Sequence, residues 1–101
     1  MRFVLSRQAE RALEELWDFY FQNGGDLLAN RILGEIHDAI HRLIELPQLG
    51  HYRPDLTDKP FRFYRVYNIL IIYDPASSPL FVARIYHAAQ DIKTRIIDEP
   101  E

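Results

Sequence analysis

The feature that most constrains this chain is an apolar stripe that recurs at helical spacing between residues 28 and 46. Leucine, isoleucine and alanine return every three or four residues over about five turns, which places them on one face of a helix. The stripe ends at Pro47, which cannot continue a helix. Because a helix with such a face is stable only when another layer covers it, the rest of the chain must supply that layer.

A second amphipathic segment precedes the stripe. Ser6 is a favourable N-cap, because its hydroxyl can accept a hydrogen bond from an amide of the first turn. Apolar and acidic residues then follow one another at helical spacing over residues 9–20. Gly24-Gly25 ends this helix, since glycine adopts a positive φ at no steric cost, and Asp26 begins the next one. The short break predicts an antiparallel helical hairpin.

The second half of the chain has the composition of a sheet. Residues 47–60 contain three prolines, one glycine and two aspartates, and we predict a loop there. Three strands follow at 61–66, 69–73 and 80–86, and Asn68 is expected to supply the positive φ of the first tight turn. The run 69–73 does not alternate, which indicates a strand covered on both faces. The short connections predict an antiparallel meander.

A strand at residues 2–5 and a short terminal helix at 88–97 complete the predicted order β-α-α-β-β-β-α. The fold class is α+β, with the helical hairpin packed on one face of a small, twisted, mainly antiparallel sheet. Periodicity does not decide whether the first strand joins the sheet at an edge or in its centre. We expect residues 1–101 to form a single domain, because the length suits one core.

Composition and charge exclude several classes of function. The chain has no cysteine, so it has no disulfide, no thiolate nucleophile and no cysteine-ligated zinc. Residues 1–58 carry 6 basic and 10 acidic side chains, whereas residues 59–95 carry 6 basic and 2 acidic ones. The chain is therefore no general polyanion binder, but its second half suits an acidic partner. No apolar run approaches a membrane span, and we expect a soluble cytoplasmic protein.

Several short motifs occur in a fixed order between residues 3 and 96. In chain order they are Ser6-x-x-Ala9, Leu16-Trp17-x-x-Tyr20, Leu46-Pro47-x-x-Gly50, Phe61-Arg62, Tyr67-x-Ile69-x-Ile71-x-Tyr73 and Val82-Ala83-Arg84-Ile85-Tyr86-His87-x-x-x-Asp91. Together with the element order, they resemble the ParE/RelE superfamily of toxins from bacterial type II toxin–antitoxin modules. The resemblance is to the ParE branch, which is associated with plasmid stabilisation.

The resemblance implies a function. RelE-like members are ribosome-dependent mRNA endonucleases, whereas the characterised ParE-like members poison DNA gyrase and are neutralised by a cognate antitoxin. The chain is accordingly expected to inhibit gyrase in the cytoplasm and to bind an antitoxin, and it is more an inhibitor than an enzyme. No cofactor, metal, membrane association or direct DNA binding by the toxin alone is implied.

The residues permit a test of the nuclease alternative. Metal-free RNA cleavage needs an acid and a base together with cations around the phosphate. His87 is the best acid/base candidate, with Arg84 and Arg65 as further candidates. Arg62 and Arg65 are three residues apart and so point to opposite faces of a regular strand. Leu70 stands where the nuclease branch usually carries an arginine, which favours the ParE interpretation.

Alternatives remain open at this point. As a nuclease, the chain would use His87 as acid or base, one of the three arginines to hold the phosphate, and Tyr73 or Tyr86 to stack on a base. Strand alternation places His87 with Phe81, Ala83 and Ile85, and Arg84 with Tyr86 on the other face. A purely structural His87 would hydrogen-bond the backbone or Asp91. A third alternative is a decayed toxin that only binds its antitoxin.

Two further groups of side chains, a histidine pair and an aromatic run, lie in the predicted helices. His37 and His41 have the i, i+4 spacing of two metal ligands, but no third ligand has a recognisable spacing, so they are predicted as helix surface. The aromatic run 17–21 exceeds what one helix face buries, so either Phe19 or Phe21 is exposed. The residues expected to contact target or antitoxin are Arg62, Arg65, Arg84, His87, Lys93, Arg95, Trp17 and Phe21.

Overall fold

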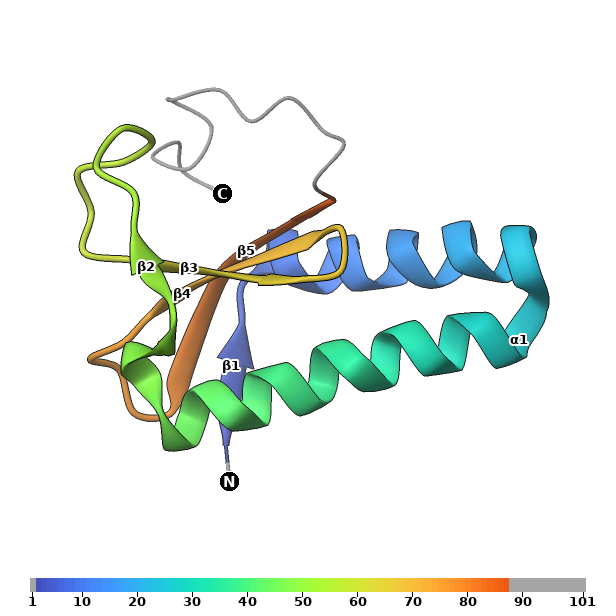
Figure 1. Cartoon of the computed structure of the whole chain (residues 1–101), viewed down its shortest axis with the longest axis horizontal. Coiled ribbons are helices and arrows are strands. Elements are labelled where there is room, and N and C mark those ends of the chain that lie inside the picture. The colour runs from blue at the N-terminus through green and yellow to red at the C-terminus, as the bar shows by residue number, and fades with distance from the viewer. Residues whose placement is uncertain (1, 88–101) are drawn as a thin grey trace.

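The structure, a computed structural model, describes residues 2–87 of the 101-residue chain. The predicted terminal helix at 88–97 lies outside the described residues. The elements in chain order are β1 (Phe3–Leu5), α1 (Arg7–Glu45), the 3-10 helix η1 (Pro47–Leu49), β2 (His51–Tyr52), β3 (Arg62–Val66), β4 (Ile69–Asp74) and β5 (Leu80–His87) (Figure 1).

The element α1 is a helical hairpin, as the sequence predicts. Gly25 lies inside it with φ 77° and ψ −172°, a conformation outside any helix, and the chain reverses direction there. The first arm (residues 7–24) and the second arm (residues 26–45) therefore run antiparallel (Figure 1). The positive φ expected of the glycine pair is confirmed at Gly25, although its ψ is extended rather than left-handed helical.

The hydroxyl of Ser6 caps the first arm and also reaches the sheet. Its Oγ accepts a hydrogen bond from the Ala9 amide at 3.1 Å, so the predicted N-cap is confirmed. The same Oγ donates to the Ala83 carbonyl of β5 at 2.6 Å, and Ser6 is buried. One side chain thus fixes the start of the helical layer against the sheet.

The five strands form one sheet in the order β1-β5-β4-β3-β2. β1 lies at an edge and runs parallel to β5, and the other neighbours are antiparallel. The sheet is therefore mainly antiparallel, and the position of the first strand is settled. The prediction of a plain loop over 47–60 was wrong, because η1 and β2 lie within it and Tyr52 pairs with Arg62.

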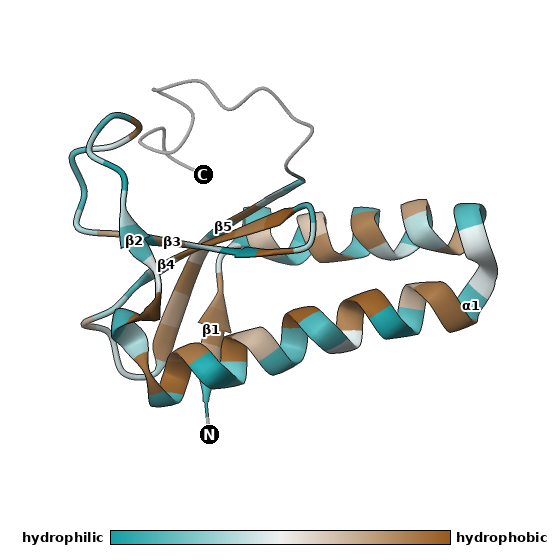
Figure 2. Ribbon diagram, viewed as in Figure 1, coloured by the Kyte–Doolittle hydropathy of each residue, from teal (hydrophilic) through white to brown (hydrophobic). Residues whose placement is uncertain are grey.

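Both faces of β4 are covered, as its unbroken apolar run predicts. On the helix side of the sheet, which the arms of α1 cover, Ile69, Ile71 and Tyr73 pack into the main core. Ile72 packs on the opposite face of the sheet, away from the helices, which we call the far side. Residues of the main core from α1 and β5 include Ile36, Ile40, Leu43, Val82 and Ile85. The apolar colouring of β4 and β5 and of the second arm follows this arrangement (Figure 2).

A β-bulge in β5 overturns one prediction about faces. Ile72 pairs with Arg84 but Tyr73 pairs with Val82, so Ala83 is an extra residue in β5. The extra residue shifts the alternation, and Val82 and Ile85 both face the helix-side core although they are three apart. His87 consequently shares its side with Val82, and Phe81 lies on the far side. The predicted grouping of His87 with Phe81 and Ala83 was wrong, because simple alternation fails at a bulge.

The turn between β3 and β4 also differs from the prediction. The residue with positive φ is Tyr67, at 54°, and not Asn68. Side chains hold this conformation: Arg65 Nε donates to the Tyr67 carbonyl at 2.8 Å, and the Tyr67 hydroxyl donates to Glu35 of the second arm at 3.2 Å. Tertiary contacts therefore outweigh the local preference of asparagine for this conformation.

Gly25 and Gly34 of α1 give a matched test of the hairpin. Gly25→Ala should lower the free energy of unfolding by about 1–3 kcal/mol, because its φ and ψ are accessible only to glycine. Gly34→Ala in the second arm should raise it by about 0.5–1 kcal/mol, because an added Cβ meets nothing within 4 Å there and alanine favours a helix. Urea unfolding measures both changes. If both variants raise or both lower the free energy of unfolding, the assignment of the chain reversal to Gly25 is contradicted.

Candidate functional site

His87 ends β5 beside the aromatic side chains of the first arm. Its Nε2 lies 3.5 Å from the Tyr20 hydroxyl, at the long end for a hydrogen bond, and its ring meets the Phe19 ring edge-on at 5.7 Å between centroids. The ring is half-buried on the helix side of the sheet. The imidazole therefore faces aromatic groups of α1. The predicted partner Asp91 lies outside the described residues.

A groove runs between the first arm and β5 next to this histidine. Its volume is about 310 Å³, and the lining residues are Gln8, Ala12, Glu15, Leu16, Phe19, Ile85 and His87. The Gln8 side-chain amide closes one end by pairing with both backbone groups of Ile85, each at 2.9 Å. Beyond the end of β1, the Gln8 side chain thus satisfies the backbone groups of β5 that a neighbouring strand would otherwise pair with. Among residues 2–87, the groove is lined by the acidic Glu15 and by no lysine or arginine.

Arg62 begins β3, beside the short edge strand β2. Its Nη1 donates to the Gly50 carbonyl at 2.6 Å, and its guanidinium lies 4.1 Å from the centre of the Tyr52 ring. Its register partner Tyr73 faces the helix-side core, so Arg62 is on that side. These contacts hold the guanidinium against β2 and the turn before it.

Arg65 and Arg84 lie on the far side of the sheet. Arg65 is exposed and shares a row with Leu70 and Tyr86, and Tyr86 belongs to the far-side cluster. Arg84 shares the next far-side row with Ile72 and is only 8% exposed, with Nη1 donating to the Ala83 carbonyl at 2.7 Å. Arg62 and Arg65 are therefore on opposite sides, as their spacing predicts.

The candidate catalytic residues do not converge within the described residues. His87 faces the first arm on the helix side, whereas Arg65 and Arg84 occupy the far side. Lys93 and Arg95 lie outside the described residues. Within residues 2–87, no group of three or more histidine, aspartate and glutamate side chains could hold a metal ion. The geometry of residues 2–87 thus provides no cation-lined pocket around the imidazole of His87.

Comparison with protein families gives one match. The model of the family described as the ParE toxin of type II toxin-antitoxin system, parDE, matches residues 3–92. The chain belongs to the ParE toxin family. The resemblance found in the sequence is confirmed, and the chain is a toxin of a type II module, which implies an antitoxin partner. No curated protein matches this toxin at a significant level.

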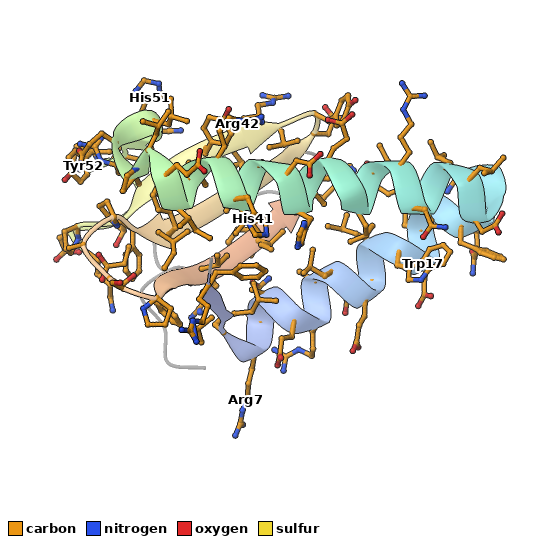
Figure 3. The ribbon with its side chains drawn as sticks, turned by 90° about the horizontal axis from the view of Figure 1, so that it is seen from below. Arg7, Trp17, His41, Arg42, His51 and Tyr52 are labelled. Atoms are coloured by element: carbon orange, nitrogen blue, oxygen red, sulfur yellow. The ribbon has the colours of Figure 1, made fainter. Side chains whose placement is uncertain are left out.

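Two of the exposed aromatic residues of the toxin lie on the first arm, toward the reversal of the hairpin. Phe19 is 50% and Phe21 46% exposed, so both are accessible and not just one of them. The Trp17 and Phe21 rings pack together at 5.2 Å between centroids, and Figure 3 shows Trp17 far from the β2 end of the sheet. Leu27, just after the reversal, is 83% exposed. The Trp17 and Phe21 pair suits contact with another protein.

Some contacts that shape the site could not be predicted from the sequence. The pairing of Gln8 with Ile85 had no signal in the sequence, because it depends on where β1 ends beside β5. The contact of Tyr52 with Arg62 was hidden by the proline-rich composition of its segment. Along residues 2–87, none of the helical segments is both long and apolar enough to cross a bilayer.

The Tyr73 hydroxyl anchors the turn that holds Arg62. It accepts a hydrogen bond from the Gly50 amide at 2.9 Å and donates to the Pro47 carbonyl at 2.6 Å. The approach is close: a Cβ on Gly50 would lie 2.7 Å from this oxygen. Burial raises the pKa of the Tyr73 hydroxyl above its ordinary value, and the hydrogen bond from Gly50 opposes the shift.

Tyr73→Phe should lower the free energy of unfolding at pH 7 by about 1–2 kcal/mol, because both buried hydrogen bonds are lost. A raised pKa in the folded state means that the hydroxyl contributes fully below its ordinary pKa of 10.0 and less at higher pH. The difference between the variant and the wild type should therefore narrow above about pH 10. Urea unfolding at several pH values measures it.

The matched control is Tyr67→Phe, whose hydroxyl has an exposed carboxylate partner in Glu35. This variant should lower the free energy of unfolding by less than about 1 kcal/mol at pH 7, because the hydrogen bond that it removes is exposed. A loss as large as that of Tyr73→Phe would contradict the assigned role of the buried hydroxyl.

Proposed function

We propose that this toxin arrests growth by inhibiting DNA gyrase through protein contacts and that a cognate antitoxin neutralises it in the cytoplasm. Residues 1–101 act in this proposal as a single toxin domain that needs no cofactor. The observation that carries the proposal is the match to the ParE family over residues 3–92, joined to the separation of His87 from the far-side arginines.

The separation bears directly on the nuclease alternative. General acid–base chemistry requires the imidazole within hydrogen-bond reach of the reacting ribose and phosphate, and the charge of the transition state requires cations at the same place. A phosphate bound by Arg65 on the far side would be divided from His87 by the sheet itself. Leu70, beside Arg65, adds an apolar group where a further cation would be needed.

The packed pair of the half-buried Trp17 and the exposed Phe21 is the favoured contact for the target. Aromatic side chains are enriched at the centres of protein interfaces, because they bury a large area at a low cost in conformational entropy. The pair projects from the arm that carries the acidic residues Glu14 and Asp18, so a target surface with basic groups around an apolar hollow would suit it.

The antitoxin is proposed to bind the basic sheet half of the toxin. Arg65 is exposed there. Its guanidinium donates hydrogen bonds to two neutral acceptors, the Tyr67 carbonyl and the Asn68 side-chain oxygen, so its charge is available to an acidic partner. An acidic or amphipathic antitoxin segment would pair with Arg65 on the far side, and Arg62, on the helix side, remains a proposed contact for another segment of the same antitoxin. Arg84, being buried, contributes in this proposal through the shape of the far side, and Lys93 and Arg95 remain proposed contacts.

A supercoiling assay with purified gyrase tests the target. The wild-type toxin at micromolar concentration should inhibit supercoiling, and Phe21→Ala should raise the concentration for half inhibition by about tenfold, the usual cost of a central aromatic contact. The matched control is Phe19→Ala, which removes an equally exposed ring that faces His87 instead. Phe19→Ala should change inhibition less than threefold.

Other outcomes would overturn the proposal. If supercoiling is unaffected while induced toxin cuts mRNA at the ribosomal A site, and His87→Ala abolishes the cutting, the toxin is a RelE-like ribonuclease. If induction without the antitoxin leaves growth unchanged, the protein is a decayed toxin that keeps only its antitoxin-binding role.

A charge reversal tests the antitoxin surface. Arg65→Glu should weaken binding of the antitoxin encoded beside the toxin gene by about tenfold at low salt and by less at high salt, because the contact is electrostatic and exposed. Arg31→Glu changes the net charge equally from an exposed position on the second arm and serves as the control. Calorimetric titration at two salt concentrations measures both, and equal effects would refute the sheet-half interface.

A further inference from the structure

Two histidines on the second arm bring their ring nitrogens together. His37 and His41 are one helical turn apart, and their Nε2 atoms lie 3.2 Å from each other. The ring centroids are 4.4 Å apart and the ring planes are inclined at 54°. His37 is exposed and His41 half-buried, so the point between the two nitrogens is open to solvent on one side. The sequence alone gave the spacing but not the direction of the rings.

Phe3 of β1 supports both rings. Its ring meets that of His37 at 6.0 Å and that of His41 at 5.9 Å between centroids, in each case edge to face. Since β1 is fixed in the sheet by its pairing with β5, this support belongs to the folded protein and not to the isolated helix. Figure 3 shows His41 projecting from the second arm. The two imidazoles are therefore arranged before any ligand arrives.

The separation of the two nitrogens matches the bite of a metal chelate. With metal–nitrogen distances of 2.0–2.1 Å, two ligands are about 2.9 Å apart at a ligand angle of 90° and about 3.3 Å apart at the tetrahedral angle. The observed 3.2 Å lies between these values. We propose that His37 and His41 form a two-imidazole site for a divalent transition-metal ion of the zinc, nickel and copper class.

The donor set defines the selectivity of this site. Neutral imidazole nitrogens suit zinc, copper and nickel, whereas magnesium and calcium prefer oxygen ligands. Among residues 2–87, no third histidine or carboxylate completes the site. The protein supplies two ligands, and water or a donor from another molecule takes the remaining positions. Each Nε2 would bind the ion through its lone pair, with the proton of each neutral ring on Nδ1.

Binding at this site couples to folding. The two nitrogens meet only when the second arm is helical, so the metal binds the folded protein in preference to the unfolded chain. Such preference raises the midpoint of thermal unfolding as the metal concentration rises. The inference rests on the His37 and His41 geometry alone and is independent of the gyrase proposal.

Calorimetric titration of untagged toxin with nickel or zinc tests the site. One ion should bind per chain, and His37→Ala and His41→Ala should each weaken binding by about tenfold or more, because removal of either ligand leaves a single contact. His51→Ala removes an exposed histidine of β2 and should leave the affinity unchanged. Magnesium at the same concentrations should give no binding. Unchanged affinity in either helix variant would overturn the proposal.

A second measurement on the wild-type protein covers the case in which a variant fails to fold. Substoichiometric paramagnetic nickel should broaden the ring signals of His37 and His41 before those of His51 and His87. Broadening that begins at His51 or His87, or that affects all four rings equally, would place the metal elsewhere and reject the site.

Discussion

The Ser6 hydroxyl is the contact on which the arrangement of the two layers depends. It accepts from the first turn of α1 and donates to Ala83, the extra residue of the bulge in β5. A hydroxyl can do both at once, whereas a methyl group would leave the helix amide and the strand carbonyl without this partner in a buried place. The start of the helical hairpin is thereby fixed to the strand that carries the candidate functional residues.

The bulge at Ala83 changes which residues of β5 face the helices. Residues after it keep the opposite alternation from residues before it, so that Ile85 and His87 turn toward the helices and Arg84 turns away. An imidazole packed against aromatic rings and a buried guanidinium on the other face do not form an acid–base site. The exposed Phe21 on the first arm and the exposed Arg65 on the far side of the sheet instead suit contacts with other proteins. These two surfaces are the basis of the proposed gyrase and antitoxin contacts.

Much of the fold was predictable because it follows from local patterns. The apolar stripe of the second arm, the glycines at the reversal and the unbroken run of β4 each specify their own element. Three features escaped: the strand at Tyr52, the positive φ at Tyr67 and the faces of β5. Each depends on a contact with a residue distant in sequence, such as Arg62 against Tyr52 or Glu35 against Tyr67. Local propensity carries no information about such contacts.

The sequence by itself determined the family, the helical hairpin, the three strands of the meander, and the opposite facing of Arg62 and Arg65, because periodicity and short motifs are properties of neighbouring residues. Only the tertiary structure decided that β1 pairs in parallel at an edge, that His87 faces Tyr20 and not the arginines, and that His37 and His41 converge against Phe3. The physical reason is the same in each case. A strand register, a bulge or a side-chain direction is set by packing between segments far apart in the chain, where one residue of shift reverses the face of every side chain that follows.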